Sequence, residues 1–360
     1  MDYLYDDPEW PAFRWDHAAI AGKLGDVRHR QGRLIGRMES LGLPLQSQAT
    51  HRSLIDDAVK TSEIEGEFLD VEIVRSSVAR RLGLPYAATP LDSQVEGVVV
   101  MLIDATGNFA APLTEQRLFA WHRGLLEGNP RIIVGAWRDG PMRVVSGPIG
   151  REKVHYEAPP AAAVPAEMRA FLDWFNRPAT TDPVLKAAVA HLWFITIHPF
   201  DDGNGRIARA LTDMLLARSE GSSRRFYSMS GQIRRDRADY YAVLERTQKR
   251  TLDVTPWLEW FLGCLNRAID ATVRTLEVVN VAAAFWRRHE GTGLNDRQRR
   301  IIGRLLEGTF EGKLTSSKWA KLAKCSQDTA LRDIESLIEH GIIEKEPGGG
   351  RSTAYRLLMP

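Results

Sequence analysis

Residues 198–209 read HPFDDGNGRIAR, and this stretch separates two apolar segments. In both segments the apolar side chains recur at helical spacing, and Pro199 indicates that the first helix ends near His198. The second helix begins within the stretch itself. The apolar positions are Val184, Leu185, Ala188, Val189, Leu192 and Ile195 before the stretch and Ile207, Leu211, Met214 and Leu215 after its start. The sequence therefore predicts a tight loop between two buried helices.

This loop is predicted to bind phosphate groups. Gly203 and Gly205 can adopt backbone angles that are closed to other residues, so the N–H groups of the loop can converge on an anion. The N-terminus of the second helix adds free N–H groups and a partial positive charge. Arg206 and Arg209 lie three positions apart on one helical face, where both guanidinium groups can reach one polyphosphate.

Two further side chains of the stretch suit chemistry on a bound phosphate. Asp202 offers a hard oxygen ligand for a magnesium ion that bridges phosphates. His198 is a titratable group that can take a proton from an incoming hydroxyl. Taken singly, a histidine or a Gly-x-Gly more often serves packing or a turn. Together they indicate phosphoryl or nucleotidyl transfer.

The stretch resembles, position for position, the His-Pro-Phe-x-(Asp/Glu)-Gly-Asn-Gly-Arg-x-x-Arg signature of the Fic family. The resemblance implies a mainly α protein, in which a Fic-type helical core of about residues 91–275 carries a β-hairpin flap. It also implies a protein adenylyltransferase with ATP and Mg²⁺ as cofactors. Such an enzyme transfers AMP from ATP to a hydroxyl of a target protein and releases pyrophosphate.

The same resemblance implies a role for each polar residue of the stretch. His198 is the general base, and Asp202 holds the magnesium ion. Arg206 binds the β-phosphate, and Arg209 reaches the γ-phosphate. The residues that seat the α- and β-phosphates are Gly203, Asn204 and Gly205.

A second motif lies upstream, where a helix predicted over residues 45–60 runs into TSEIEGE at residues 61–67. Thr61 and Glu65 share one helical face, and Gly66 is a plausible helix end. By itself this run is typical of a solvated acidic helix end. It also resembles the (Ser/Thr)-x-x-x-Glu-(Gly/Asn) inhibitory motif of the Fic family. That resemblance implies that Glu65 pairs with Arg209 and so takes the place of the γ-phosphate.

A hairpin is predicted between residues 131 and 157, with a turn at Arg138-Asp139-Gly140-Pro141 and a second break at Gly147-Pro148. It covers the core or, by resemblance to the Fic flap, aligns a target segment by strand addition so that a hydroxyl faces His198.

Family resemblance places an aromatic side chain against the adenine, and Tyr240 or Tyr241 is the candidate. Packing in the core is an equally good interpretation of both tyrosines.

The last segment resembles a winged helix-turn-helix domain over residues 294–360. It follows an N-terminal helical region (1–90), the Fic core (91–275) and a helical linker (276–293) that links the domains or forms a homodimer. Residues 291–360 hold 12 Lys/Arg and 9 Asp/Glu, a weak basic surplus. The winged helix would bind either DNA or a protein.

Composition excludes several classes of protein. The formal net charge is +2 at pH 7, so no strong field for nucleic acid or membranes is implied. The sequence shows no apolar run of transmembrane length and no signal peptide. The two cysteines, Cys264 and Cys325, lack metal-ligand spacing and are predicted to be reduced. We expect a cytoplasmic protein with no membrane partner.

The sequence thus favours an autoinhibited protein adenylyltransferase, which modifies a Ser, Thr or Tyr hydroxyl of a target protein or of itself. Two alternatives stay open. The protein could be a DNA-binding regulator whose Fic domain senses nucleotide or modifies the regulator. It could also remove AMP from a modified protein, with Glu65 aligning a water molecule.

Overall fold

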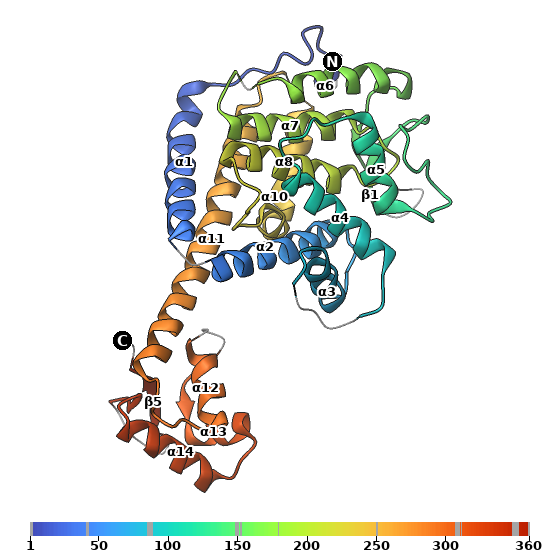
Figure 1. The fold of residues 1–360 in the computed structure, drawn as a ribbon. Coiled ribbons are helices and arrows are strands. Elements are labelled where there is room, and N and C mark those ends of the chain that lie inside the picture. The colour runs from blue at the N-terminus through green and yellow to red at the C-terminus, as the bar shows by residue number, and fades with distance from the viewer. Residues whose placement is uncertain are drawn as a thin grey trace. The chain divides into compact units, whose positions relative to one another are not determined.

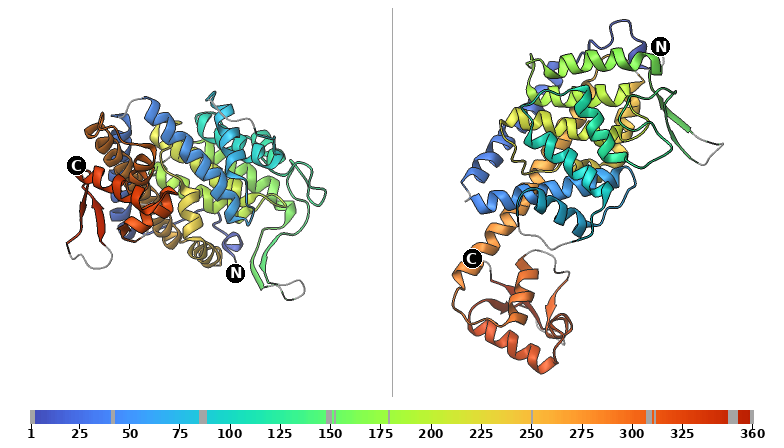
Figure 2. Two further views of the ribbon diagram at one scale, coloured as in Figure 1. Left: turned by 90° about the horizontal axis from the view of Figure 1, so that it is seen from below. Right: turned by 45° about the vertical axis from the view of Figure 1, so that its right-hand side comes forward.

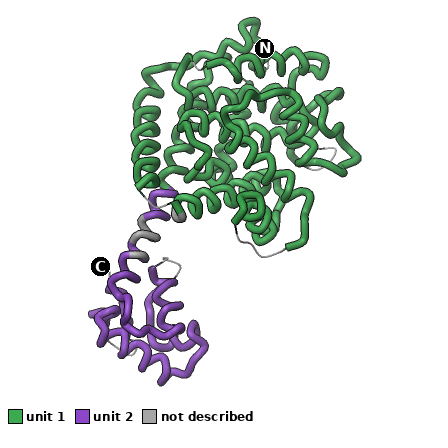
Figure 3. Tube along the Cα trace, viewed as in Figure 1, with its two compact units in different colours: residues 1–270 green, residues 271–360 purple. Residues whose placement is uncertain are grey.

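The computed structural model describes residues 3–40, 43–84, 89–147, 151, 153–178, 180–249, 251–306, 310, 312–347 and 353–358. The chain is mostly helical and divides into two compact units, residues 1–270 and 271–360 (Figures 1 and 3). None of the helices in the described ranges is long and apolar enough to cross a membrane. Cys264 and Cys325 are both free thiols, as the sequence predicts.

The centre of the first unit is a pair of helices, α7 (Pro183–Ile197) and α8 (Asn204–Glu220). Every residue of α7 from Val184 onward is buried, which explains why apolar side chains surround this helix on all sides. Helix α7 packs most extensively against α8, which in turn packs against α4. The surrounding helices are α1 (His17–Glu39), α2 (Leu43–Ile64), α3 (Val71–Arg81), α4 (Ser93–Gly107), α5 (Glu115–Leu126), α6 (Val164–Asn176), α9 (Met229–Arg235) and α10 (Arg237–Gln248).

The N-terminal segment, which is rich in aromatic residues, packs across this core. A short 3₁₀ helix, η1 (Leu4–Asp6), begins it. The rings of Tyr3 and Tyr156 meet edge to face with centroids 5.1 Å apart. Trp10 and Phe13 pack edge to face against Trp193 of α7. The segment therefore covers apolar surface of the central helices.

A two-stranded antiparallel hairpin, β1 (Arg143–Ser146) and β2 (Lys153–Glu157), projects from the helices, as Figure 2 shows. It lies later in the chain than the sequence predicts, because Arg138-Asp139-Gly140-Pro141 precedes β1 and does not form the turn. The physical reason is that Arg138 is buried and donates hydrogen bonds to backbone carbonyl groups. A short 3₁₀ helix, η2 (Ala161–Ala163), follows the hairpin.

Helix α11 runs without a break from Thr255 to Arg288. It passes without interruption through residues 275 and 276, where the predicted core meets the predicted helical linker. Residues 270–275 contain neither glycine nor proline, so nothing in the backbone interrupts the helix.

The second unit has the element order of a helix, a short strand, two helices and a hairpin. Its three-stranded antiparallel sheet has the order β3-β5-β4. Trp319 and Ile334 lie in its core, and Arg297 pairs with Asp333. The bounds are α12 (Asp296–Leu306), β3 (Leu314–Thr315), α13 (Ser316–Ala323), α14 (Gln327–Glu339), β4 (Ile343–Lys345) and β5 (Ala354–Leu357). The winged-helix classification stays a prediction; the wing tip around Arg351 lies outside the described residues.

Candidate functional site

The loop between α7 and α8 is held closed by a side chain of the motif. Asn204 accepts a hydrogen bond from the Phe200 N–H (3.0 Å) and donates one to the Phe200 carbonyl (2.8 Å). These two bonds use the amide oxygen and one amide N–H, and leave the second amide N–H and the backbone N–H of Asn204 as donors for a phosphate. The assignment of Asn204 to the phosphate site stays a prediction.

His198 ends α7 in the left-handed conformation, with φ 50° and ψ 60°. Its Nδ1 lies 3.1 Å from the Ile195 carbonyl oxygen. Because a carbonyl only accepts, Nδ1 carries the proton of the neutral ring, and Nε2 keeps a lone pair. Burial lowers the pKa of His198 below its ordinary value, so the ring is neutral at pH 7. This is the state that a general base requires.

The two glycines of the loop are needed for different reasons. Gly203 has φ +75°, a conformation that favours glycine. Gly205 lies inside α8, and there the requirement is space. A Cβ atom at Gly205 would lie 2.3 Å from Oε1 of Glu65 and 3.2 Å from Nη1 of Arg209. The backbone freedom that the sequence predicts for both glycines is therefore needed only at Gly203.

Arg209 is buried at the start of α8 and contacts the end of α2. Its Nε donates to Oγ1 of Thr61 (2.7 Å), and its Nη2 donates to the Thr61 carbonyl (3.0 Å) and to Oε1 of Glu65 (2.7 Å). Gly66, with φ +88°, turns the chain directly after Glu65. Within the described part of the chain Nη1 of Arg209 has no hydrogen-bond partner. The structure thus brings together the three residues of the upstream motif and the last arginine of the signature.

Arg206 is equally buried and pairs with a residue that the sequence analysis missed. Its Nη1 lies 2.6 Å from Oε2 of Glu67, whereas its Nη2 is 4.0 Å from Asp202. Its Nε is buried without a partner among the described residues. Two carboxylates on either side of Gly66 therefore hold two arginines one helical turn apart. The spacing of Glu65 and Glu67 is the feature of the sequence that could have predicted the contact between Glu67 and Arg206.

Asp202 lies at the mouth of the loop, where its side chain is 54% exposed. Its Oδ1 accepts a hydrogen bond from the Gly203 N–H (2.6 Å). In the ranges that the structure describes, no group of three or more His, Cys, Asp or Glu side chains is placed to hold a metal ion. Magnesium nevertheless fits this donor set, because it is commonly bound by one or two carboxylates together with substrate phosphates.

His122 of α5 is buried and supports the loop. Its Nδ1 accepts the Gly135 N–H (2.9 Å), so its Nε2 carries the proton and donates to the Asp202 carbonyl (3.2 Å). Its ring stacks on Phe200 with centroids 4.1 Å apart.

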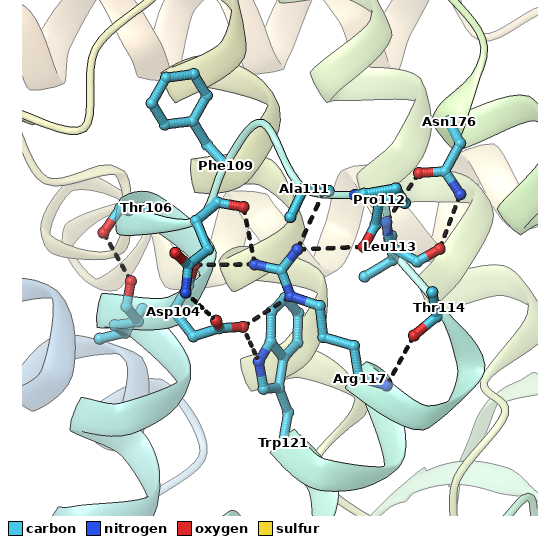
Figure 4. A network of polar contacts seen from close by, with 12 residues as sticks. Asp104, Thr106, Phe109, Ala111, Pro112, Leu113, Thr114, Arg117, Trp121 and Asn176 are labelled. Atoms are coloured by element: carbon cyan, nitrogen blue, oxygen red, sulfur yellow. Dashed lines mark hydrogen bonds and ion pairs between the residues drawn. The ribbon is translucent and has the colours of Figure 1, made fainter.

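Helix α5 is in turn anchored to α4 through Asp104 (Figure 4). Both Nε of Arg117 and Nε1 of Trp121 donate to Oδ2 of Asp104, each at 2.7 Å. The position of the loop thus depends on contacts far from it in sequence.

The two candidate tyrosines differ in position. Tyr240 is buried, hydrogen-bonds Nε2 of His191 (2.8 Å) and packs against Trp260, so it belongs to the core. Tyr241 is 38% exposed and lies 3.5 Å from the carbonyl of Ile64, beside the upstream motif. Of the two tyrosines, only Tyr241 has exposed surface on which an adenine ring could pack.

Comparison with known proteins agrees with this geometry. Residues 112–216 match the model of the Fic/DOC family. The chain contains a Fic domain. Residues 3–84 match a second model, described as a domain of unknown function (DUF4172). The resemblance that the signature suggests is therefore confirmed.

Several curated relatives of this Fic-domain chain are named protein adenylyltransferase Fic. The one from Nematostella vectensis is 26% identical over 235 residues, which are 64% of this chain and 51% of that protein. The one from Drosophila willistoni is 32% identical over 105 residues, which are 29% of this chain and 20% of that protein. The chain thus spans about half the length of the first relative and a fifth of the second.

Solved structures share the fold. A Fic family protein from Desulfovibrio desulfuricans G20 aligns with a TM-score of 0.54 and 24% identity, covering 94% of this chain and 96% of that one. Fic-1 from C. elegans aligns with a TM-score of 0.52 and 22% identity, covering 72% of this chain and 74% of that one. The predicted helical core with a β-hairpin is confirmed.

Proposed function

We propose that the protein is an autoinhibited protein adenylyltransferase, which transfers AMP from Mg-ATP to a Ser, Thr or Tyr hydroxyl of a target protein or of itself. One observation carries the proposal. Beside the neutral His198, Arg206 and Arg209 are buried at the start of α8, and each has an N–H group without a partner among the described residues. Buried cations at a helix N-terminus are suited to a polyphosphate. The names of the curated relatives point the same way.

The arrangement accounts for each part of the transfer. The acceptor hydroxyl gives its proton to Nε2 of His198 while its oxygen forms a bond to the α-phosphorus. The bond between that phosphorus and the bridging oxygen breaks, and pyrophosphate leaves. Arg206 and Arg209 stabilise the negative charge that gathers on the departing phosphates. Asp202 would hold the magnesium ion, which neutralises phosphate charge when it is bound.

Inhibition follows from competition for the same guanidinium groups. Glu65 occupies Nη2 of Arg209, and Glu67 occupies Nη1 of Arg206. A carboxylate at either place both satisfies the arginine and repels an incoming phosphate. In this state ATP would bind weakly and in a pose unsuited to in-line attack.

The second unit gives less support to a DNA-binding regulator. The exposed charged residues of α14 are Asp328, Arg332, Glu335 and Glu339, a net negative set. A helix that reads a major groove must approach phosphates on both sides, and acidic residues oppose that approach. We therefore favour the transferase over a DNA-binding regulator. The charges of α14 suit a protein partner better than DNA.

The proposal is tested by incubating the protein with α-labelled ATP and magnesium. The wild type, Glu65→Gly and His198→Ala variants are compared, each with and without a cell extract as a source of targets. We expect little label on protein for the wild type, at least tenfold more for Glu65→Gly, and none for His198→Ala. Equal labelling of the wild type and Glu65→Gly would remove the inhibitory claim. Label that survives His198→Ala would remove the catalytic one.

A further inference from the structure

Arg138 connects the hairpin to the catalytic loop. It lies between α5 and β1 and is only 2% exposed. Its backbone N–H donates to the Pro199 carbonyl (3.0 Å), and its Nε donates to the His198 carbonyl (2.8 Å). Its Nη2 donates to the Pro159 carbonyl (2.6 Å), and its Nη1 to the Gly140 carbonyl (2.9 Å). One side chain thus contacts three separate segments.

These segments are the parts that the proposed reaction must align. Gly140 precedes β1, Pro159 follows β2, and His198 carries the base. A single guanidinium group therefore hydrogen-bonds the segments at both ends of the hairpin and the backbone carbonyl of His198. A second link supports the same alignment, since the Tyr156 hydroxyl of β2 donates to the Thr196 carbonyl (2.6 Å).

We propose that Arg138 is a positioning residue, which fixes the hairpin, and any segment paired with it, relative to Nε2 of His198. The inference rests on the proposed function for its reaction, but its geometry does not depend on that function. The partners of Arg138 are carbonyl oxygens and not a carboxylate, so a phosphate has no anion to displace there. Arginine is required because its planar fork offers five donors in fixed directions, which lysine lacks.

The conformation of His198 shows what the contact maintains. A non-glycine residue at φ 50° is held there by its surroundings. The carbonyl group of His198 points to Nε of Arg138, and that of Ile197 lies 3.4 Å from its Nη2. Without these donors the turn that aims the imidazole would lose its partners.

Arg138 also acts on the base electrostatically. Burial is the main cause of the lowered pKa of His198; the charge of Arg138 lowers it further, while the charges of Glu65 and Asp202 raise it. Removing the positive charge should therefore raise the pKa of His198, so that more of the ring is protonated at a given pH. A residue with a merely structural role would not produce this change.

The test uses the full chain in the Glu65→Gly background, with Arg138→Met and Arg138→Lys. The matched control is Arg218→Met, because Arg218 of α8 also donates to backbone carbonyls, those of Phe109, Ala111 and Phe175, away from His198. Three quantities are measured: self-modification with α-labelled ATP, Mg-ATP affinity by calorimetry, and the pKa of His198 by NMR, assigned by its absence in His198→Ala.

We expect Arg138→Met to slow self-modification at saturating ATP at least tenfold and to raise the pKa of His198. The dissociation constant of Mg-ATP should stay within threefold. Arg138→Lys should restore the pKa, because the charge returns, and only part of the rate. Arg218→Met should change neither. The inference is overturned if Arg218→Met slows the reaction as much, or if the ATP affinity falls in proportion to the rate.

A failure of the proposed function would look different. If Glu65→Gly transfers no AMP, the transferase proposal fails, and the positioning claim is judged on the wild-type chain. There Arg138→Met should still raise the pKa of His198 and speed amide hydrogen exchange in β1 and β2, with Arg218→Met as the control. An unchanged pKa together with unchanged exchange would overturn the positioning claim.

Discussion

Four buried arginines surround the two ends of α8 and its loop, and they fall into two kinds. Arg206 and Arg209 pair with Glu67 and Glu65, whose side chains are 31% and 30% exposed. Arg138 donates hydrogen bonds to carbonyl groups. Arg225 pairs with Asp213, and the side chains of this pair are each 2% exposed. The first kind has anionic partners that reach solvent and can leave, whereas the second has partners fixed in the core.

The exposure of the anionic partner separates an ion pair that stabilises the core from one whose carboxylate another anion could replace. A partner inside the core cannot move away without leaving a buried charge. A partner at the surface end of a helix can be replaced by another anion at little cost. Arg206 and Arg209 thus have the partners expected of a site that is blocked, and Arg225 those of a structural contact.

The largest effect should come from breaking the fixed pair. Asp213→Asn takes away the carboxylate paired with the buried Arg225, which keeps only the weaker attraction of Glu220 and Asp57, and we expect it to lower the free energy of unfolding by about 3 kcal/mol. Glu65→Gln keeps a hydrogen-bond acceptor beside Arg209 and should cost less, about 1–2 kcal/mol. Denaturant unfolding at pH 8 compares them, where Asp213 is ionised because burial raises its pKa only to about 6. Equal losses in the free energy of unfolding would contradict the distinction between exchangeable and fixed partners of the buried arginines.

The next effect concerns nucleotides of different length. Glu67→Gln should tighten binding of both Mg-ADP and Mg-ATP, because Arg206 is freed for a β-phosphate. Glu65→Gln should tighten only Mg-ATP, through Arg209. An exchangeable charged contact of about 1.4 kcal/mol corresponds to roughly tenfold in affinity. AMP, which has no β-phosphate, should bind equally to all variants. Isothermal calorimetry measures each combination.

A control for these affinities lies on the same helix end. Glu63 pairs with Lys60 and Arg234 and with neither arginine of the signature. Glu63→Gln should leave all three nucleotides unaffected. A uniform gain across AMP, ADP and ATP would indicate a general charge effect and would contradict the assignment of separate phosphates.

A smaller effect tests the contact between Gly205 and Glu65. In Gly205→Ala the new Cβ would meet Glu65 and push its carboxylate off Arg209. In the Glu65→Gly background the clash is gone, and alanine is the better helix residue. We expect the two substitutions to be coupled by about 1 kcal/mol, a size typical of residues in contact. Additive changes in the free energy of unfolding would show that Glu65 does not rest on Gly205.

The smallest effect is a dependence on pH beside the fixed pair. Burial, followed by the charge of Asp213, raises the pKa of Asp57 well above its ordinary value. The folded chain therefore binds this proton more tightly, so its contribution to stability is full at low pH and is lost as pH rises through the folded pKa. As pH rises from about 4, where the Asp57 carboxyl of the unfolded chain loses its proton, the stability of Asp57→Asn should increase relative to that of the wild type. A difference that stays constant as pH rises would contradict the shift.

How much the sequence could predict depends on whether a contact is local. The loop from His198 to Arg209 carries its own helix end, glycines and charges within one short stretch, so its geometry was predictable. Arg138 was not, because its partners at 159 and 197–199 are remote in sequence, and Asp-Gly-Pro after it imitates a turn. The same holds for Glu67, which lies one residue beyond the motif that drew attention to Glu65.

The position of Glu65 and Glu67 on the same chain has a further consequence. In the proposed inhibited state they would act as a tethered ligand, present at a fixed local concentration that dilution cannot lower. An inhibitor supplied by a separate protein would dissociate as both were diluted. Free nucleotide, in contrast, competes in proportion to its abundance. The fraction of molecules with an open site would therefore depend on the nucleotide concentration and not on the concentration of the protein.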